Sequence, residues 1–434
     1  MFSHTLSAAD IENAAERIGA AVPPTPLEYS VRLSTLTGAN VYLKREDLTC
    51  VRSYKLRGAY NLMAQLSAEE RAAGVVTASA GNHAQGVAYA CRAMGVKGRI
   101  YVPTRTPKQK RDRIHAHGGA FVELIATGDT FDAASAAAAD DAARTGATMV
   151  APFDDARTAA GQGTIAREVL GQLPEAPDLV LVPVGGGGCL AGIATYLADL
   201  SPHTAIVGVE PAGAASMSAA LVAGGPVTLP EVDSFVDGTA VKRVGDVPYA
   251  VVSRLCGELY SESEPFAADL STRPIRITRV DEGAVCTAML DLYQNEGIIA
   301  EPAGALSVAV LEGLAITPGA TVVCLISGGN NDVSRYGEVI ERSLVHRGLK
   351  HYFLVDFPQE PGALRRFLDE ILGPDDDITV FEYVKRNNRE FGAALVGIEV
   401  GTADALSPLL TRMDASPFEV QRLQPETPAF RYLV

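Results

Sequence analysis

The chain has no tryptophan, and aromatic residues make up only 6% of its 434 positions. Cysteine is scarce as well: the six cysteines stand singly, and no C-x-x-C pair occurs. This pattern is typical of a reduced intracellular protein and argues against a disulfide framework or a cysteine zinc site. Positive charge is in deficit too, because 37 lysines and arginines face 52 acidic residues, for a net charge of -15. Nucleic acid is therefore not an expected partner, since phosphate backbones need basic surface.

Long apolar runs are also missing. The stretch from Ala305 to Leu311 is ended by Glu312, far short of a membrane span. Met1 to Thr5 show no basic region followed by an apolar core, so no secretory signal is recognised. These absences predict a cytoplasmic protein without a membrane partner. With 47% hydrophobic residues, a globular chain of this length is expected to form two or three domains.

Between about residues 40 and 330, short apolar runs alternate with longer helical stretches. Runs that are rich in β-branched residues on both faces predict buried parallel strands, and the alternation predicts an α/β architecture. The clearest runs are 178–182, 205–209 and 321–326, and a further strand is expected over 120–124 and a helix over 82–94. Because ligands bind at the carboxyl ends of parallel strands, residues that directly follow a strand are the candidates for a site.

After about Arg347 the order of elements changes. A strand, a helix, two strands, a helix and a strand give βαββαβ, the ferredoxin-like order, with a hairpin turn expected at Asn387–Asn388. Few catalytic residue types follow these strands, so we interpret the segment as a regulatory or interface module. The expected elements are strands 352–357, 378–384, 392–400 and 418–420, and helices 361–372 and 403–413.

These patterns suggest three parts of the chain. Residues 1–335 form a catalytic region with two parallel-sheet lobes, of which the smaller covers roughly 50–150. Residues 336–348 are a linker, and residues 349–434 are the C-terminal module.

Lys55 stands beside Tyr54 at the predicted start of a helix. A lysine that is partly desolvated there has a lowered pKa, and its free amine can attack a carbonyl. Taken alone, such a lysine is more often a solvated surface charge. Other motifs in the sequence favour the reactive interpretation, because three glycine-bearing segments directly follow predicted strands.

The first of these motifs is the tetraglycine tract Gly185 to Gly188, between a strand and a helix expected over 190–200. Backbone N–H groups at such a junction converge on a dianion at the helix N-terminus. A tight turn needs one or two glycines rather than four. The tract lacks both the G-x-G-x-x-G pattern and the lysine of a P-loop, so it predicts phosphate binding and not dinucleotide binding.

The second motif opens a helix, and its backbone donors are suited to a substrate carboxylate, with the Asn82 amide suited to a phenolate oxygen. A plain helix cap is the alternative, and His83 is taken only as a neighbour. The third motif begins at Ser327, whose neutral hydroxyl is suited to a pyridine nitrogen, or is a simple turn before glycines. The residues proposed in the second motif are Ser79, Ala80, Gly81, Asn82, His83 and Gln85.

Together the lysine and the three motifs indicate an aldehyde cofactor that carries a phosphate, which is pyridoxal 5′-phosphate (PLP). The chain resembles the fold-type II PLP enzymes, and within them the threonine dehydratases (threonine ammonia-lyases). The resemblance covers nearly the whole chain and includes Lys44–Asp47 and Glu301–Gly304.

The resemblance implies a role for each motif. Lys55 binds PLP covalently and then serves as the base, and Asn82 bonds the 3′-oxygen of PLP. Gly185 to Gly188 with the backbone of Cys189 hold the phosphate, and Ser327 meets the pyridine nitrogen. Residues 79–85 bind the substrate carboxylate.

The C-terminal module resembles the ACT-like regulatory domain of biosynthetic threonine dehydratases, most clearly at residues 357–364. Only one such unit fits, whereas some relatives carry two. The resemblance implies inhibition by isoleucine, activation by valine and a homotetramer.

Two departures concern the related serine racemases. Those enzymes have a second base, a serine, where Ala80 stands, so racemisation is expected to be slow. They also use an acidic cation site, but Ser216 occupies one expected acidic position near Glu210, so no firmly held divalent metal is expected.

The sequence thus predicts a carbon–oxygen lyase that converts L-threonine to 2-oxobutanoate and ammonia, the first step of isoleucine biosynthesis, with L-serine as a slower substrate. Alternatives are a catabolic serine/threonine dehydratase, a β-replacement enzyme and a non-catalytic amino-acid sensor. A dinucleotide-dependent oxidoreductase is a further alternative from another class.

Overall fold

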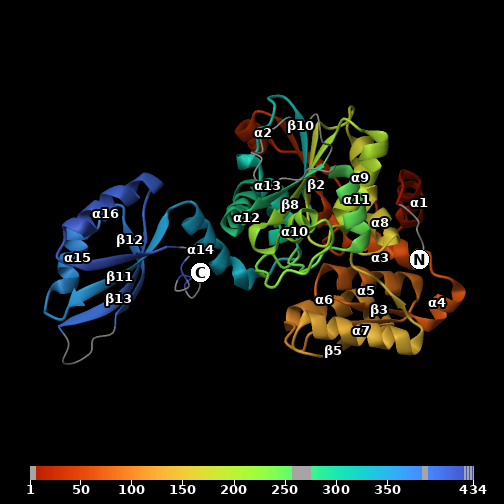
Figure 1. The fold of residues 1–434 in the computed structure, drawn as a ribbon, viewed down its shortest axis with the longest axis horizontal. Helices are drawn as coiled ribbons and strands as arrows, with labels where there is room; N and C mark the ends of the chain where they lie inside the picture. Colours follow the sequence, from red (N-terminus) through yellow and green to blue (C-terminus); the bar gives the residue numbers. More distant parts are fainter. Residues whose placement is uncertain are drawn as a thin grey trace. The chain divides into compact units, whose positions relative to one another are not determined.

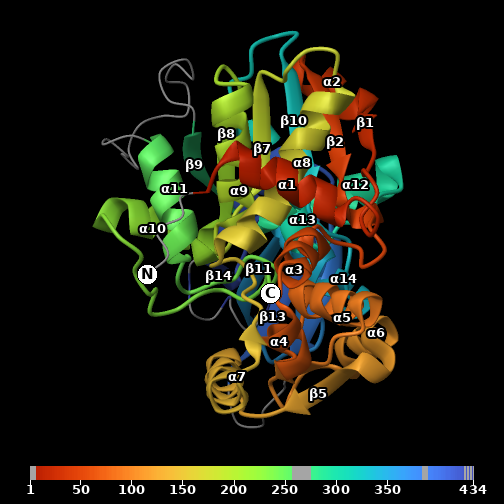
Figure 2. The ribbon, with the colours of Figure 1, turned by 90° about the vertical axis from the view of Figure 1, so that its right-hand side faces the viewer.

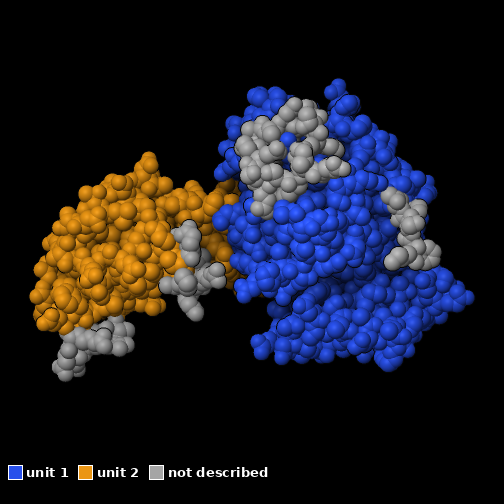
Figure 3. Space-filling model, in the orientation of Figure 1, with its two compact units in different colours: residues 1–282, 292–331 blue, residues 283–291, 332–434 orange. Residues whose placement is uncertain are grey.

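The computed structural model describes residues 6–256, 275–383 and 390–424, together with Thr427, Phe430 and Leu433. The chain forms two compact units, residues 1–282 with 292–331 and residues 283–291 with 332–434, coloured separately in Figure 3. The hairpin turn expected at Asn387–Asn388 lies outside the described residues. No helix among the described residues is long and apolar enough to cross a membrane.

A six-stranded sheet forms the larger part of the first unit, in the order β1-β2-β10-β7-β8-β9. Neighbouring strands are parallel except at one edge, where β1 runs antiparallel to β2. Every residue of β7 and β8 is buried, which confirms the prediction from their apolar runs. The strands are β1 (Leu27–Tyr29), β2 (Asn40–Arg45), β7 (Leu179–Pro183), β8 (Ala205–Pro211), β9 (Ile275–Val280) and β10 (Thr321–Ile326).

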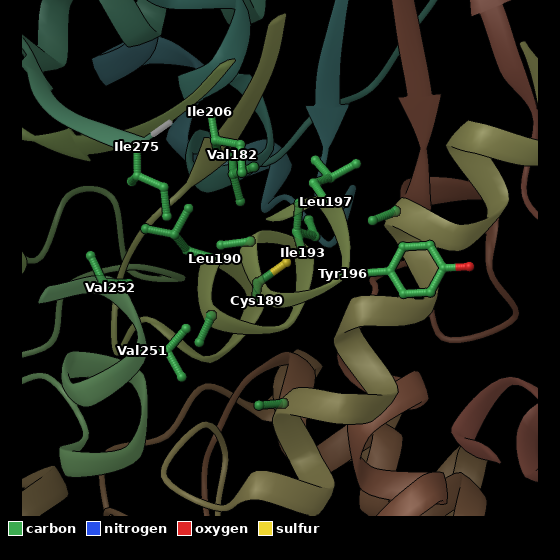
Figure 4. Packing of buried hydrophobic residues seen from close by; sticks show 14 of the residues in the cluster. Val182, Cys189, Leu190, Ile193, Tyr196, Leu197, Ile206, Val251, Val252 and Ile275 are labelled. Carbon is green, nitrogen blue, oxygen red and sulfur yellow. The ribbon is translucent and has the colours of Figure 1, made fainter. Parts of the chain in front are cut away.

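Helices cover both faces of this sheet. Helices α1, α8 and α9 lie on one face in Figure 2, and α13 lies on the opposite face in Figure 1. Helix α9 packs its side chains into the main hydrophobic cluster, shown in Figure 4, so its N-terminal end is held in place. The helices of this part are α1 (Ala8–Ile18), α2 (Val31–Thr37), α8 (Ala156–Gln172), α9 (Gly188–Leu200), α10 (Ser216–Ala223), α11 (Asp246–Cys256) and α13 (Pro302–Ala309). Helix α12 (Glu282–Glu296) is divided between the two units.

A smaller sheet in the same unit is parallel throughout, in the order β5-β4-β3-β6. The structure places Ala120 and Phe121 in a 3-10 turn rather than in the strand expected there, because Gly119 bends the chain with a φ of 53°. The elements are β3 (Val75–Ala78), β4 (Gly98–Val102), β5 (Val122–Ala126), β6 (Thr148–Met149), α3 (Lys55–Ala64), α4 (Ala68–Ala73), α5 (Asn82–Met94), α6 (Lys108–Gly118) and α7 (Phe131–Thr145).

The second unit has an antiparallel sheet in the order β12-β13-β11-β14, which confirms the ferredoxin-like fold. Its core contains the rings of Phe357, Phe367 and Phe418, which pack against one another in tilted and edge-on pairs. The segment assigned to a linker, 336–348, contains a helix, α14. The elements are α14 (Tyr336–His346), β11 (Lys350–Pro358), α15 (Ala363–Ile371), β12 (Asp377–Tyr383), β13 (Phe391–Glu399), α16 (Leu406–Ala415) and β14 (Glu419–Leu423).

A buried cluster of four charged side chains anchors helix α3 in the first unit. Arg57, two residues after Lys55, forms ion pairs with Glu46 at 2.7 Å and Glu168 at 2.6 Å. Lys44 pairs with Glu168 at 2.6 Å. Burial by itself lowers the pKa of Arg57, but the two carboxylates outweigh burial and raise it above its ordinary value. The ion pairs therefore tie α3 to α8 and β2.

We expect Arg57→Met to destabilise the first unit, because the variant leaves Glu46 buried without its cation. Removal of one partner from a buried ion pair costs about 3–5 kcal/mol. Scanning calorimetry measures the shift in the unfolding midpoint. The exposed pair Lys108–Asp112 gives the control, since Lys108→Ala should change stability by less than about 0.5 kcal/mol. Equal midpoints for the two variants would contradict an anchoring role.

Candidate active site

The segment before Lys55 is joined to the carboxyl end of β10. Ser53 and Gly328 form an isolated antiparallel bridge. The N–H of Tyr54 donates to the carbonyl of Ser327 at 3.2 Å. These backbone contacts bring the start of α3, which is Lys55, to the residues that follow β10.

Lys55 occupies a largely desolvated position. Its Nζ donates to the carbonyl of Pro152 at 3.0 Å and lies 5.3 Å from the centre of the Tyr54 ring. Burial lowers the pKa of Lys55 to about 8, because a charged amine is poorly solvated there. About one tenth of the amine is therefore neutral at pH 7, far more than for an ordinary lysine, and this is the form that attacks a carbonyl.

The tetraglycine tract leads directly into α9. Gly187 caps the helix with a φ of 88°, a conformation that favours glycine. Among the described residues, none accepts a hydrogen bond from the backbone N–H groups of Gly185 to Cys189. Five unpaired donors at the positive end of a helix are suited to a phosphate dianion. The tract thus fits the phosphate of PLP.

Cys189 at the start of α9 lies close to Lys55. The two groups influence each other electrostatically, and burial raises the pKa of the Cys189 thiol to about 12. Tyr54 also packs against the hydrophobic cluster that contains Cys189. Lys55 and the unpaired N–H groups therefore adjoin one another.

Asn82, which follows β3 of the smaller sheet, forms hydrogen bonds with residues of the larger lobe. Its Nδ2 donates to Oε1 of Glu301 at 2.6 Å, and its Oδ1 accepts from Nδ2 of Asn330 at 2.8 Å. Burial, followed by the nearby charge of Asp237, raises the pKa of Glu301 to about 7. This carboxyl group therefore exchanges its proton close to neutral pH, in direct contact with Asn82.

The first turn of α5 offers further unpaired donors. In the part of the chain that the structure describes, the N–H groups of Asn82, His83 and Ala84 donate to no residue. The Nε2–H of buried His83 donates to the carbonyl of Val150 at 2.9 Å, which leaves Nδ1 as an acceptor without a partner. Burial lowers the pKa of His83 to about 3, so the ring is neutral.

The remaining candidates contribute less directly. Ser79 uses its Oγ to accept from the N–H of Gly81 at 3.2 Å, and Ala80 presents only a methyl group. Gln85 is buried, and its Oε1 has no partner. Across the described ranges, no hydrogen bond links Ser79 or Gln85 to Lys55.

Ser327 is buried at the end of β10, and its hydroxyl donates to the carbonyl of Ala303 at 3.2 Å. At the end of β10 the group that Ser327 offers is therefore a neutral hydroxyl and not a carboxylate. Because Ala303 uses the single O–H hydrogen, the hydroxyl must turn before it can donate to an unprotonated pyridine nitrogen.

The connector between β6 and α8 was missed by the sequence analysis. It supplies the carbonyls of Val150 and Pro152, which accept from His83 and Lys55. Its Phe153 ring lies against Gly186. The connector directly follows a parallel strand, and residues in that position were the candidates elsewhere in the chain, so the same rule could have identified it. Glu301 was noted only as part of a longer motif.

Glu210 is satisfied by protein donors rather than by a metal. Its carboxylate accepts from the N–H groups of Met217 at 2.6 Å and Ser218 at 2.9 Å. Among the described residues, no group of three or more histidine, cysteine and acidic side chains could hold a metal ion. That no divalent metal is firmly held stays a prediction.

Comparison with known families gives two matches along the chain. The family described as "Pyridoxal-phosphate dependent enzyme" matches residues 18–328. The family described as "C-terminal regulatory domain of Threonine dehydratase" matches residues 341–433.

Individual relatives are similar over nearly the full length. A Mycobacterium tuberculosis protein named "L-threonine dehydratase biosynthetic IlvA" is 68% identical, over 99% of this chain and 96% of that protein. The protein of the same name from Corynebacterium glutamicum is 62% identical, over 99% and 95%. The solved structure of processed threonine deaminase isoform 2 from Solanum lycopersicum is 38% identical and has a TM-score of 0.68, over 78% of this chain and 96% of that chain.

The raised pKa of Glu301 predicts a pH-dependent stability. The folded protein keeps the proton up to about pH 7, whereas the unfolded chain releases it near 4.5, so stability falls as pH rises through this window. The loss is up to about 3 kcal/mol, at about 1.4 kcal/mol for each pKa unit. Glu301→Gln should remove this part of the decline in a series of unfolding midpoints.

The exposed Glu312 provides the matched control for that series. Glu312→Gln should keep the pH profile of the unsubstituted protein. If Glu301→Gln also keeps it, the carboxyl group of Glu301 does not hold a proton at neutral pH.

Proposed function

Because the chain belongs to the family of pyridoxal-phosphate dependent enzymes and carries the regulatory domain of threonine dehydratases, we propose that it is a biosynthetic L-threonine dehydratase. The reaction eliminates water from L-threonine, and the resulting enamine then takes up water and releases ammonia to yield 2-oxobutanoate, the first step of isoleucine synthesis. The observation that carries the proposal is a desolvated lysine next to five unpaired backbone donors.

PLP, when bound, supplies an electron sink for the pair of electrons left at the substrate α-carbon. Lys55 holds the cofactor through its amine and, once displaced by the substrate amine, takes the α-proton. Its lowered pKa supports both tasks, because the neutral form is accessible. The N–H groups of Gly185 to Cys189 bind the phosphate.

The first turn of α5 is proposed to bind the substrate carboxylate. Support comes from the unpaired N–H groups of Asn82 and His83 and from the positive end of the helix. One hydrogen of the Asn82 amide is used by Glu301, which leaves the second for the 3′-oxygen of the cofactor. Ser327 is proposed to face the ring nitrogen.

The C-terminal module is proposed to bind isoleucine as an inhibitor and valine as an activator. Its match to the regulatory domain of threonine dehydratase supports control by an amino-acid effector. The proposal includes a cytoplasmic homotetramer and L-serine as a secondary substrate that yields pyruvate.

The alternatives from the sequence are less well supported. A catabolic dehydratase or a β-replacement enzyme does not agree with relatives named biosynthetic that match from end to end. A non-catalytic sensor does not need the desolvated lysine. The methyl group of Ala80 cannot carry a proton, so racemisation is proposed to be slow.

Lys55→Ala should abolish 2-oxobutanoate release and the visible absorption of the lysine-bound cofactor, because no other amine replaces it. Both are followed by spectrophotometry after addition of PLP. Lys108→Ala removes an exposed lysine and should leave both signals unchanged. A Lys55→Ala protein that retains activity would refute the assignment.

An amino-acid panel tests substrate and control together. L-Threonine should release 2-oxoacid faster than L-serine, and isoleucine should raise the threonine concentration required for half-maximal rate. Valine should reverse this shift. Release of 2-oxoacid from threonine without any response to isoleucine would support the catabolic alternative, and binding of isoleucine without any release would support the sensor.

A further inference from the structure

The tetraglycine tract contains only one residue whose backbone conformation requires glycine. Gly187 has a φ of 88°, whereas Gly185, Gly186 and Gly188 do not have a positive φ. A side chain at these three positions would be compatible with the backbone conformation. Another constraint must account for the absence of side chains there.

That constraint is steric at each of the three positions. A Cβ on Gly186 would lie 2.2 Å from Cγ of Phe153 and 2.3 Å from its Cδ1, well inside contact distance. A Cβ on Gly188 would meet the backbone of the same residue, 2.9 Å from the carbonyl oxygen of Phe153. On Gly185 it would lie 2.9 Å from Cα of Thr239.

The chain on either side of Phe153 is held by hydrogen bonds. The carbonyl of the preceding Pro152 accepts from Lys55. Oδ1 of the following Asp154 accepts from the N–H of Val247 at 2.9 Å. The backbone at Phe153 therefore cannot shift away from Gly186 without disturbing contacts at the start of α3 and in α11.

We propose that Phe153 is a positioning residue for the phosphate-binding loop. Its ring packs on Gly186 and fixes the loop in the shape in which the N–H groups of Gly185 to Cys189 stay unpaired. Glycine is needed at position 186 because of this ring and not because of the phosphate. The phosphate-binding part of this inference rests on the proposed function, whereas the packing part does not.

The physical reason is that five unpaired donors are an unstable arrangement without support. A flexible loop would turn its N–H groups towards water or towards its own carbonyls. An aromatic ring that packs against a glycine restricts the movement of the loop, because close-packed groups leave no space for the backbone to shift. The donors are then already oriented when a dianion arrives, which lowers the entropic cost of binding.

A double-mutant cycle tests the inference. Four proteins are compared: the unsubstituted protein, Gly186→Ala, Phe153→Ala and the double variant. Two quantities are measured, the Kd for PLP from cofactor absorbance after dialysis, and the thermal midpoint of the cofactor-free protein. Gly186→Ala alone should raise the Kd about tenfold or more and lower the midpoint by several degrees, as overpacking does.

In the Phe153→Ala background the same change at Gly186 should cost far less in both measurements, because the space is open. Phe153→Ala alone should raise the Kd, since the loop loses its support. If Phe153→Ala does not fold, Phe153→Ser replaces it, because serine has one small γ atom that can turn away from position 186 and lacks the Cδ atoms that lie 2.3 Å and 2.4 Å from the added methyl group.

Two glycines of the same tract serve as matched controls. Gly185→Ala meets the backbone of Thr239, and Gly188→Ala meets the backbone and Cβ of Phe153, which truncation of the ring does not remove. Neither should be rescued by Phe153→Ala.

The inference is overturned if Gly186→Ala costs as much in the Phe153→Ala background as alone, which would assign the glycine to the phosphate itself. It is equally overturned if Gly186→Ala is harmless. Failure of the proposed function has a separate signature, because the unsubstituted protein would then show no cofactor absorbance while the midpoints still report the packing.

Discussion

The burial of Arg57 between Glu46 and Glu168 is the interaction on which the site depends. A guanidinium with no exposed surface is stable only with charged partners, and its two carboxylates come from different elements of the fold. Arg57 is two residues from Lys55, so the ion pairs fix the first turn of α3. A fixed first turn allows the Lys55 amine to remain in a desolvated position, where its pKa falls.

The site is assembled from the ends of strands in two separate sheets. Ser79 to His83 follow β3 of the smaller sheet, whereas Gly185 and Ser327 follow β7 and β10 of the larger one. Side-chain and backbone hydrogen bonds close the gap between them: Asn82 bonds to Glu301 and Asn330, and Tyr54 bonds to Ser327. The groups proposed for the substrate carboxylate thus follow the smaller sheet, whereas those proposed for the cofactor come from both lobes.

The fold was largely accessible from the sequence, because its signals are local. The expected strand 321–326 and the expected helix 82–94 have the same bounds in the structure, since β-branched runs and a glycine before a helix act over neighbouring residues. The start of β5 was misplaced, because the turn at Gly119 was not recognised. The linker contains α14, whose residues were given no helical assignment.

The sequence by itself determined which residue types follow the strands. It thereby identified the lysine, the glycine tract and the neutral hydroxyl of Ser327 as candidates. Only the tertiary structure decided their environment. The lowered pKa of Lys55, the raised pKa of Glu301 and the contact of Phe153 with Gly186 depend on burial by segments far apart in the chain. Local patterns carry no record of such distant neighbours, because desolvation and steric exclusion arise only when the chain packs.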